Sequence, residues 1–192
     1  NGLETLHKGI IGQLNELIGK LITEHGINRN SIYSMTIAGN STMMHLAAGI
    51  PPKNIAAAPF IPASLELMRI TAAEMGIEIA EQGWIYLLPG ISAYIGADIT
   101  AATLASGLGN SDSFSLLIDI GTNGEIMRGN KDRLLSCSTA AGPAFEGATI
   151  RDGVGGIAGA INAVTLHDSS LGFTTIGNER PIGICGSGLV DT

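Results

Sequence analysis

Residues 114–125 read FSLLIDIGTNGE, a run of apolar residues that meets one acid and then enters a Gly-Thr-Asn-Gly turn. A short apolar run bounded by turn residues is typical of a strand buried on both faces, and we expect this strand at Phe114 to Ile118. Burial does not explain Asp119. An acid beside glycines and a hydroxyl indicates backbone amides gathered around an anion, with the carboxylate kept for a metal ion or a water.

The turn itself supplies the groups that an anion needs. Gly121 and Gly124 can adopt positive φ and bring main-chain N–H groups close to phosphate oxygens. Thr122 and Asn123 add side-chain hydrogen bonds. An ordinary hairpin turn is the alternative interpretation of the same residues.

Two acids flank this turn. We expect Asp119 to hold Mg²⁺ through water, which makes it both the metal residue and a catalytic residue. Glu125 is the second catalytic candidate, because it could orient a water. The alternative for Glu125 is an exposed residue at the rim of the site.

The composition limits the possible partners. The 192 residues are 45% hydrophobic and 14% charged, which is enough for a buried core in one large domain or two small ones. A formal net charge of −7 without any basic run argues against nucleic acid and anionic membranes. No apolar stretch approaches the roughly 20 residues of a membrane span and no signal peptide is evident, so we expect a cytoplasmic protein.

The chain has two cysteines, Cys137 and Cys185. They are too few for a disulfide framework, a CxxC metal site or the ligand set of an iron–sulfur cluster. This predicts a reducing compartment. The chain also begins at Asn1 without methionine, which predicts a piece of a longer protein.

The first half alternates helical and extended patterns. Apolar residues at three- and four-residue steps predict an amphipathic helix that ends near His25–Gly26, with a stripe at Leu3, Leu6, Ile10, Leu14, Leu17, Ile18, Leu21 and Ile22. Next we expect a strand, a short helix, a proline-broken loop, a strand and a helix, at residues 31–38, 39–49, 51–64, 84–90 and 93–107. The pattern of residues 65–81 is ambiguous.

A turn-rich joint at residues 108–113 separates this half from a different pattern. Three short strands at hairpin spacing follow, and the start of a helix is expected after them, at residues 114–121, 124–129, 133–138 and 141–150. The order predicts an α/β fold of the actin-like, ribonuclease-H-like type, with mixed sheets and flanking helices. Residues 1–107 would be the latter part of the first lobe, and residues 114–192 the beginning of the second.

Four motifs carry a family resemblance. In chain order they are AGNSTMMHL, DIGTNGE, STAAGPAFEGATI and GICGSGLVD, at residues 38–46, 119–125, 138–150 and 183–191. Together they resemble the reductive activators of corrinoid proteins, whose ATPase module belongs to the superfamily of acetate and sugar kinases, heat-shock chaperones and actin (ASKHA). The resemblance covers nearly the whole chain and implies ATP and Mg²⁺ as cofactors.

The resemblance implies nucleotide contacts in two further motifs. Gly142 opens a segment that leads a helix towards the nucleotide, and Glu146 would reach the ribose or adenine; the alternative is that Glu146 complements the helix dipole. Gly186, Ser187 and Gly188 match the adenosine position, where a glycine backbone lets the base and ribose approach closely.

AGNST matches the linker between the lobes. There, Gly39 and Asn40 would face the phosphates across the cleft. An N-cap formed by Asn40 or Ser41 is an alternative that does not exclude this role. His45 on the following helix is interpreted as a hydrogen-bonded core histidine and not as a metal ligand.

The activity implied by the resemblance is ATP-driven transfer of one electron to a Co(II) corrinoid, which regenerates Co(I). The partner would be a corrinoid protein or a corrinoid-dependent methyltransferase, and we expect a homodimer. The alternatives are a small-molecule kinase, an activator of another radical enzyme, and a non-catalytic actin-like assembly module.

The resemblance also implies material that these 192 residues lack. The complete protein would carry a [2Fe-2S] domain before this module, and a first phosphate-binding hairpin before the long helix. The ATPase site is therefore expected to be incomplete, and the 192 residues alone are expected to be inactive.

Overall fold

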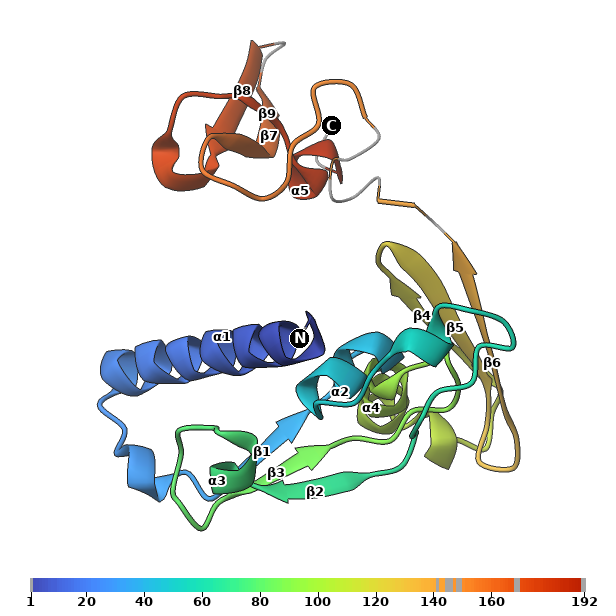
Figure 1. The fold of residues 1–192 in the computed structure, drawn as a ribbon. Helices are drawn as coiled ribbons and strands as arrows, with labels where there is room; N and C mark the ends of the chain where they lie inside the picture. Colours follow the sequence, from blue (N-terminus) through green and yellow to red (C-terminus); the bar gives the residue numbers. More distant parts are fainter. Residues whose placement is uncertain (1, 141, 144–146, 148–149, 168–169, 191–192) are drawn as a thin grey trace. The chain divides into compact units, whose positions relative to one another are not determined.

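The computed structural model describes residues 2–140, 142–143, 147, 150–167 and 170–190 (Figure 1). Two compact units are present: residues 1–117 with 127–137, and residues 118–126 with 138–192. The main elements of the first unit are α1 (Gly2–His25), β1 (Ser34–Ile37), α2 (Ser41–Ala47), β2 (Met68–Thr71), α3 (Ala72–Met75), β3 (Trp84–Leu87) and α4 (Ala97–Ser106). Short 3₁₀ turns lie at Arg29–Ser31, Lys53–Ile55 and Leu108–Asn110.

The first sheet has the strand order β1-β3-β2. β3 pairs parallel with β1 and antiparallel with β2. Its central strand alternates in burial, with Ile85 and Leu87 almost completely buried. These two side chains join residues from α1, α2 and α3 in the main apolar core, so one face of the sheet carries the core (Figure 1).

The long helix α1 begins and ends as the apolar stripe predicts, and Gly26 follows it with a φ of 62°. Ile10, Leu14 and Ile18 pack on the core beside the buried Ile11. The rest of the expected stripe is less covered: Leu6, Leu17 and Leu21 are exposed.

A polar contact fixes α1 against the segment that follows α3. The Asn15 side chain donates to the Gly76 carbonyl oxygen and accepts from the Glu78 amide, both at 2.8 Å. This pair of bonds satisfies backbone groups beyond the end of α3, where a helix leaves carbonyls without partners.

The ambiguous residues 65–81 form β2 and the one-turn helix α3. Thr71 and Glu74 form a capping box, in which the Thr71 hydroxyl accepts from the Glu74 amide and the Glu74 carboxylate accepts from the Thr71 amide. These bonds lower the pKa of the Glu74 carboxyl, first through the Thr71 hydroxyl and then through its amide. Gly76 ends the helix with a φ of 75°.

The second sheet has the order β4-β5-β6, with strands at Ser115–Ile120, Asn123–Gly129 and Leu134–Ala140. The three predicted strands are confirmed. Burial on both faces of the first strand is not: Leu117 packs in a cluster with Ile99 of α4 and Met127 of β5, whereas Leu116 and Ile118 are exposed. Alternation explains the difference, because α4 covers only one face of this sheet in the described residues.

The joint at residues 108–113 is bonded to the turn between β5 and β6. The Lys131 amide donates to the Ser111 carbonyl oxygen at 2.8 Å, and the Asn130 side chain donates to the Asp112 carbonyl oxygen at 3.3 Å. Lys131 and Asp112 also form an ion pair. Backbone and side chains therefore both hold the joint in place.

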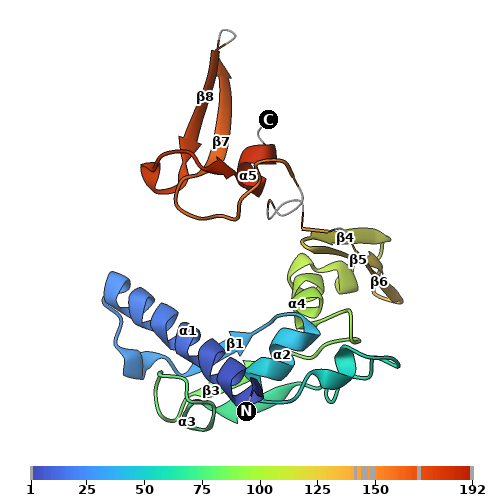
Figure 2. The same ribbon diagram turned by 45° about the horizontal axis from the view of Figure 1, so that its top comes forward.

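The remaining elements belong to the second unit: β7 (Ala160–His167), β8 (Ser170–Thr175), the 3₁₀ turn Ile176–Asn178, β9 (Gly183–Ile184) and α5 (Gly186–Val190). β7 pairs antiparallel with β8 and parallel with β9. Figure 2 shows the β7–β8 hairpin with α5 beside its base. The predicted helix at residues 141–150 is not seen at the described residues: Gly142 is irregular, Pro143 and Ile150 form bends, and Gly147 lies in a turn.

The architecture is a mixed α/β fold of several small sheets with helices. Among the described helices, none combines the length and the apolar character needed to cross a membrane. The assignment of residues 1–107 and 114–192 to two ribonuclease-H-like lobes stays a prediction.

Candidate functional site

The DIGTNGE stretch forms the turn between β4 and β5. The Gly121 amide donates to the Asn123 carbonyl oxygen at 2.9 Å, which closes the turn. Asp119, Thr122 and Asn123 are exposed, and Gly124 is buried. The turn therefore presents a carboxylate, a hydroxyl and a carboxamide to the surroundings within five residues.

The prediction that the two glycines of the turn adopt positive φ is wrong. Neither Gly121 nor Gly124 has a φ between +20° and +160°. A Cβ at Gly124 would stand 3.2 Å from the Thr139 Cγ2 on β6, a close contact that a small shift of Thr139 would relieve. The Gly121 amide is used within the turn, so contact with an anion would depend on the amides and side chains that follow it.

The two predicted catalytic acids share one face of the sheet. Leu117 of β4 and Met127 of β5 pack in the same cluster, and Asp119 and Glu125 each lie two residues nearer the turn. Because side chains alternate along strands, both acids project from the face that carries Leu117 and Met127. A pair of carboxylates beside a hydroxyl suits Mg²⁺, which binds through one or two carboxylates and keeps waters and phosphate oxygens as its other ligands.

Glu125 has a partner that the sequence did not reveal. The Ser138 hydroxyl on β6 donates to the Glu125 carboxylate at 3.2 Å. Glu125 is half-buried, so the bond orients a carboxylate that is only partly open to solvent. Ser138 begins the third motif, but only the strand pairing shows that it meets the second motif.

The third motif is bonded to the same turn. The Gly142 amide donates to the Thr122 carbonyl oxygen at 2.9 Å, and Gly142 has a φ of 84° that favours glycine. Two predicted nucleotide-binding residues are thus brought together. Glu146 lies outside the described residues.

The fourth motif forms α5, which begins at Gly186. Gly186 and Gly188 are buried, and Ser187 is exposed. A Cβ on Gly188 would overlap the Ile161 carbonyl oxygen of β7 and stand 3.0 Å from the Ile184 Cγ1. Glycine at this position therefore lets α5 pack closely on β7, which is a different reason from the predicted approach of a nucleotide.

Cys185 precedes α5 and is buried. Its thiol donates to the Ile161 carbonyl oxygen at 3.2 Å and lies 3.3 Å from the Ser187 hydroxyl. The bond with Ser187 lowers the pKa of the Cys185 thiol, while burial opposes the shift.

Gly39 and Asn40 lie in the first unit and cap two helices. The Gly39 carbonyl oxygen accepts from the Ala97 amide at 2.9 Å and from the Asp98 amide at 3.3 Å, at the start of α4. The Asn40 side chain accepts from the Met43 amide at 2.9 Å and caps α2. The N-cap interpretation of Asn40 is confirmed, and a role towards phosphate stays a prediction.

Gly96 completes this junction and was not predicted as part of a site. A Cβ on Gly96 would stand 2.6 Å from the Asn40 Cα and 2.8 Å from the Gly39 carbonyl oxygen. The start of α4 can approach the AGNST segment only because residue 96 has no side chain. The sequence around Gly96, a glycine before an alanine-rich helix, does not predict its contact with Gly39 and Asn40.

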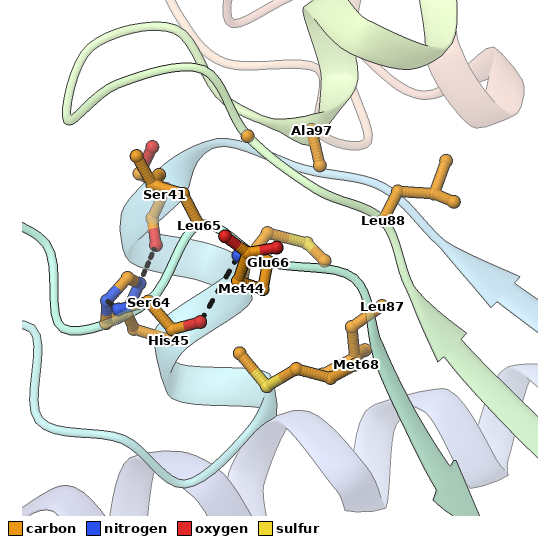
Figure 3. A pocket seen from close by; sticks show the side chains of 11 residues that line it. Ser41, Met44, His45, Ser64, Leu65, Glu66, Met68, Leu87, Leu88 and Ala97 are labelled. Carbon is orange, nitrogen blue, oxygen red and sulfur yellow. Dashed lines mark hydrogen bonds between the residues drawn. The ribbon is translucent and has the colours of Figure 1, made fainter.

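His45 on α2 is the core histidine that the sequence predicts, with only 2% of its surface exposed. Its Nδ1 lies 2.6 Å from the Ser41 carbonyl oxygen, and its Nε2 accepts from the Ala63 amide at 3.1 Å. The Nδ1–H tautomer satisfies both bonds. Figure 3 shows the ring beside Ser41 and Ser64, so His45 fastens the proline-rich loop to α2 and has no free nitrogen for a metal ion.

A hollow of about 400 Å³ lies in the first unit between α4 and the β5–β6 hairpin. Its lining is mostly apolar and has no charged side chain, with Ile91, Leu104, Met127 and Leu134 among its residues. Thr103 also lines it, and among the described side chains its buried hydroxyl is a polar group without a hydrogen-bond partner. The hollow is unsuited to a phosphate, which requires donors or cations.

Thr103→Val is expected to leave the free energy of unfolding unchanged or to raise it by up to about 1 kcal/mol. The substitution keeps the shape of the side chain and removes a buried hydroxyl that makes no bond, and such a group costs about 1–3 kcal/mol when it is left unsatisfied. Chemical unfolding followed by circular dichroism measures the change. Thr100→Val is the matched control, because the Thr100 hydroxyl donates to the Gly96 carbonyl oxygen. Marked destabilisation by Thr103→Val alone would show that the hydroxyl has a partner.

The described residues contain no group of three or more His, Cys, Asp or Glu side chains that could hold a metal ion by themselves. The arrangement near Asp119 thus differs from a closed structural metal site. It can present two carboxylates, a hydroxyl and turn amides to a ligand that brings its own oxygens.

These features define an actin-like α/β protein with the motif set of an ASKHA domain. Residues 1–111 match the family described as the RACo middle region, and residues 113–192 match the family described as the C-terminal domain of RACo, the ASKHA domain. The chain belongs to the RACo family.

Three relatives agree with this assignment. Corrinoid activation enzyme RamQ of Eubacterium limosum is 37% identical over 193 residues, which cover 99% of this chain and 32% of that protein. [Co(II) methylated amine-specific corrinoid protein] reductase of Methanosarcina barkeri is 40% identical over 77 residues, or 40% of this chain and 14% of that protein. The solved structure of a reductive activator for corrinoid, iron–sulfur protein is 44% identical with a TM-score of 0.84, over 99% of this chain and 31% of that one. The chain thus spans about a third of the length of the relatives that it matches from end to end.

Proposed function

We propose that this chain is part of an ATP-dependent reductive activator of a corrinoid protein. The complete protein would couple hydrolysis of ATP to transfer of one electron from a reduced [2Fe-2S] cluster to a Co(II) corrinoid, which yields Co(I). The observation that carries the proposal is the β4–β5 turn, where two acids share one face within a chain whose whole length matches such activators.

The residues of this chain would bind and orient the nucleotide. Asp119 and Glu125 would hold Mg²⁺ and an attacking water, and Ser138 would keep the Glu125 carboxylate in place. Thr122, Asn123 and Gly124 would contact phosphate oxygens, with Gly121 closing the turn and Gly142 fixing its far side. Bound Mg²⁺ would supply charge neutralisation for the phosphates.

The other predicted contacts complete the proposal. Gly186, Ser187 and Gly188 would lie near the adenosine, and Glu146 near the ribose or base. Gly39 and Asn40 would approach the phosphates from the first lobe. We further propose a cytoplasmic homodimer as the working form, with the iron–sulfur domain outside these 192 residues.

The test measures reduction of cobalt by the complete protein. It is mixed with Mg-ATP, a low-potential reductant and either a corrinoid iron–sulfur protein or the corrinoid protein of a methylated-amine methyltransferase, and Co(I) is followed by absorbance. We expect Co(I) with one of the two substrates and none when ATP is omitted. The 192 residues alone are expected to release no phosphate, because a preorganised donor set that loses one member already loses about 100-fold or more in rate.

Two results would contradict the proposal. Phosphorylation of a small molecule without cobalt reduction would favour a kinase of the same superfamily. ATP-dependent polymerisation without either reaction would favour an actin-like assembly module.

A further inference from the structure

The face of the β1-β3-β2 sheet opposite the main core has an unusual composition. The core face carries Met35, Ile37, Met68, Ile70, Ile85 and Leu87. Alternation places the intervening residues on the other face, and the strand register aligns them in two rows: Ser34, Trp84 and Thr71 in one, and Thr36, Tyr86 and Arg69 in the other. We call these six residues the aromatic face.

The centre of the aromatic face combines an arginine with two aromatic rings. The guanidinium carbon of Arg69 lies 3.7 Å from the centroid of the Trp84 ring, a close cation–π contact. Tyr86 stands directly across from Arg69 in the strand register. Trp, Tyr and Arg are the residue types that most often dominate binding energy at protein interfaces, and the hydroxyl residues around them form a polar rim.

Arg69 is a cation without an acidic partner in the described part of the chain. Its side chain is exposed and takes part in no ion pair or hydrogen bond there. The chain as a whole carries a net charge of −7, with 17 acids against 10 Lys and Arg. Arg69, which contacts the Trp84 ring and has no acidic partner among the described residues, is therefore available to a carboxylate brought by another molecule.

The hydroxyl side chains of this face distinguish it from surfaces that are permanently buried in an interface. Ser34, Thr36 and Thr71 would bring hydroxyl groups into any contact, whereas β4 carries apolar side chains on both faces. A strand with one apolar and one polar face is typical of a sheet with one solvated side. The face suits a partner that binds and leaves.

We propose that the aromatic face is the docking surface for the corrinoid protein, which presents a carboxylate to Arg69 beside an apolar side chain that packs on Trp84 and Tyr86. The inference rests on the proposed function and names the part of the molecule that meets the substrate protein. Nucleic acid does not fit, because a single arginine in an acidic chain cannot neutralise a phosphate backbone.

The first experiment observes Trp84 directly in the complete protein. The protein is labelled with 5-fluorotryptophan, and the Trp84 signal is identified by its loss in Trp84→Phe. We expect a soluble gadolinium chelate to broaden this ¹⁹F signal in the free protein. Adding the corrinoid protein should then shift the signal in a saturable way and protect it from the chelate.

The second experiment measures the KM for the corrinoid protein in the Co(I) assay. Arg69→Gln is expected to raise KM about 5-fold or more, and Trp84→Ala about 10-fold or more, because truncated hot-spot residues have effects of this size. ATP hydrolysis without corrinoid protein should stay unchanged. The salt dependence of KM should be weaker in Arg69→Gln than in the wild type.

Arg151→Gln and Tyr94→Ala are the matched controls, because both replace exposed residues elsewhere. Neither should change KM. Arg69→Glu is the second variant if Trp84→Ala does not fold, and it should raise KM further than Arg69→Gln.

The outcomes separate the two proposals. A wild-type protein that forms no Co(I) contradicts the proposed function. Normal Co(I) formation with an unshifted Trp84 signal, or with KM unchanged in the Arg69 variants, contradicts the docking face alone. A Trp84 signal that the chelate cannot reach in the free protein shows that the protein's own polypeptide covers the face, which also overturns the inference.

Discussion

Asp119→Ala in the complete protein should lower kcat for Mg-ATP hydrolysis by about 100-fold or more, the loss seen when one preorganised electrostatic group is removed from an active site. Asp119 lies one residue before the end of β4 and shares a face with Glu125, and in the proposed site its carboxylate would hold the cation that neutralises the phosphates. The affinity for ATP measured without Mg²⁺ should change little, because the side chain acts through the metal.

Steady-state phosphate release and calorimetric titration with and without Mg²⁺ distinguish these effects. Asp119→Asn retains the shape without the charge and should lose nearly as much turnover. Asp132→Ala, an exposed acid in the β5–β6 turn, is the matched control and should hydrolyse ATP normally. If Asp119→Ala turned over at the wild-type rate, Asp119 would have no place in the site.

Gly188→Ala should lower the free energy of unfolding by about 1–3 kcal/mol, the usual cost of forcing extra volume into a packed interior. The new methyl group would collide with the Ile161 carbonyl oxygen, so α5 would have to move away from β7. Since α5 carries the predicted adenosine contacts, ATP and ADP should lose affinity equally, because both nucleotides contain adenosine.

Chemical unfolding followed by circular dichroism measures the stability, and calorimetry measures the two affinities. Gly155→Ala serves as the control, because nothing lies within 4 Å of a Cβ at that position and its φ is not in the left-handed region. If both variants were equally stable, the close packing of α5 on β7 would not be a constraint on residue 188.

Local pattern was sufficient for most elements near the candidate site. The α1 periodicity, the strand after residue 30 and the three strands around DIGTNGE each depend on neighbouring residues, so the sequence predicts them. β2 and α3 were ambiguous because their signals are short. β2 forms because it pairs with β3, and α3 begins with a capping box that contributes only a pair of hydrogen bonds.

Contacts between distant residues were the part that could not be predicted. The reasons for glycine at residues 96 and 188 lie in segments that a single sequence does not connect with them. The prediction that β4 is buried on both faces was also wrong, because Leu116 and Ile118 are exposed. An apolar strand favours burial of both faces, but its sequence does not show which segment covers each face. The shared face of Asp119 and Glu125 could be deduced only once both strands and their common cluster were known.

The hydrogen bonds between the joint at residues 108–113 and the β5–β6 turn limit where the protein can be divided for expression. The two family matches meet at residue 112, which invites a cut there. Such a cut would separate Ser111 from Lys131 and would leave the β5–β6 turn without its backbone partner. A better boundary for an expressed first piece lies after Ala140, where β6 ends and the whole β4-β5-β6 sheet is kept. In limited proteolysis, a nick between residues 111 and 113 should accordingly leave two fragments that stay associated until denaturant is added.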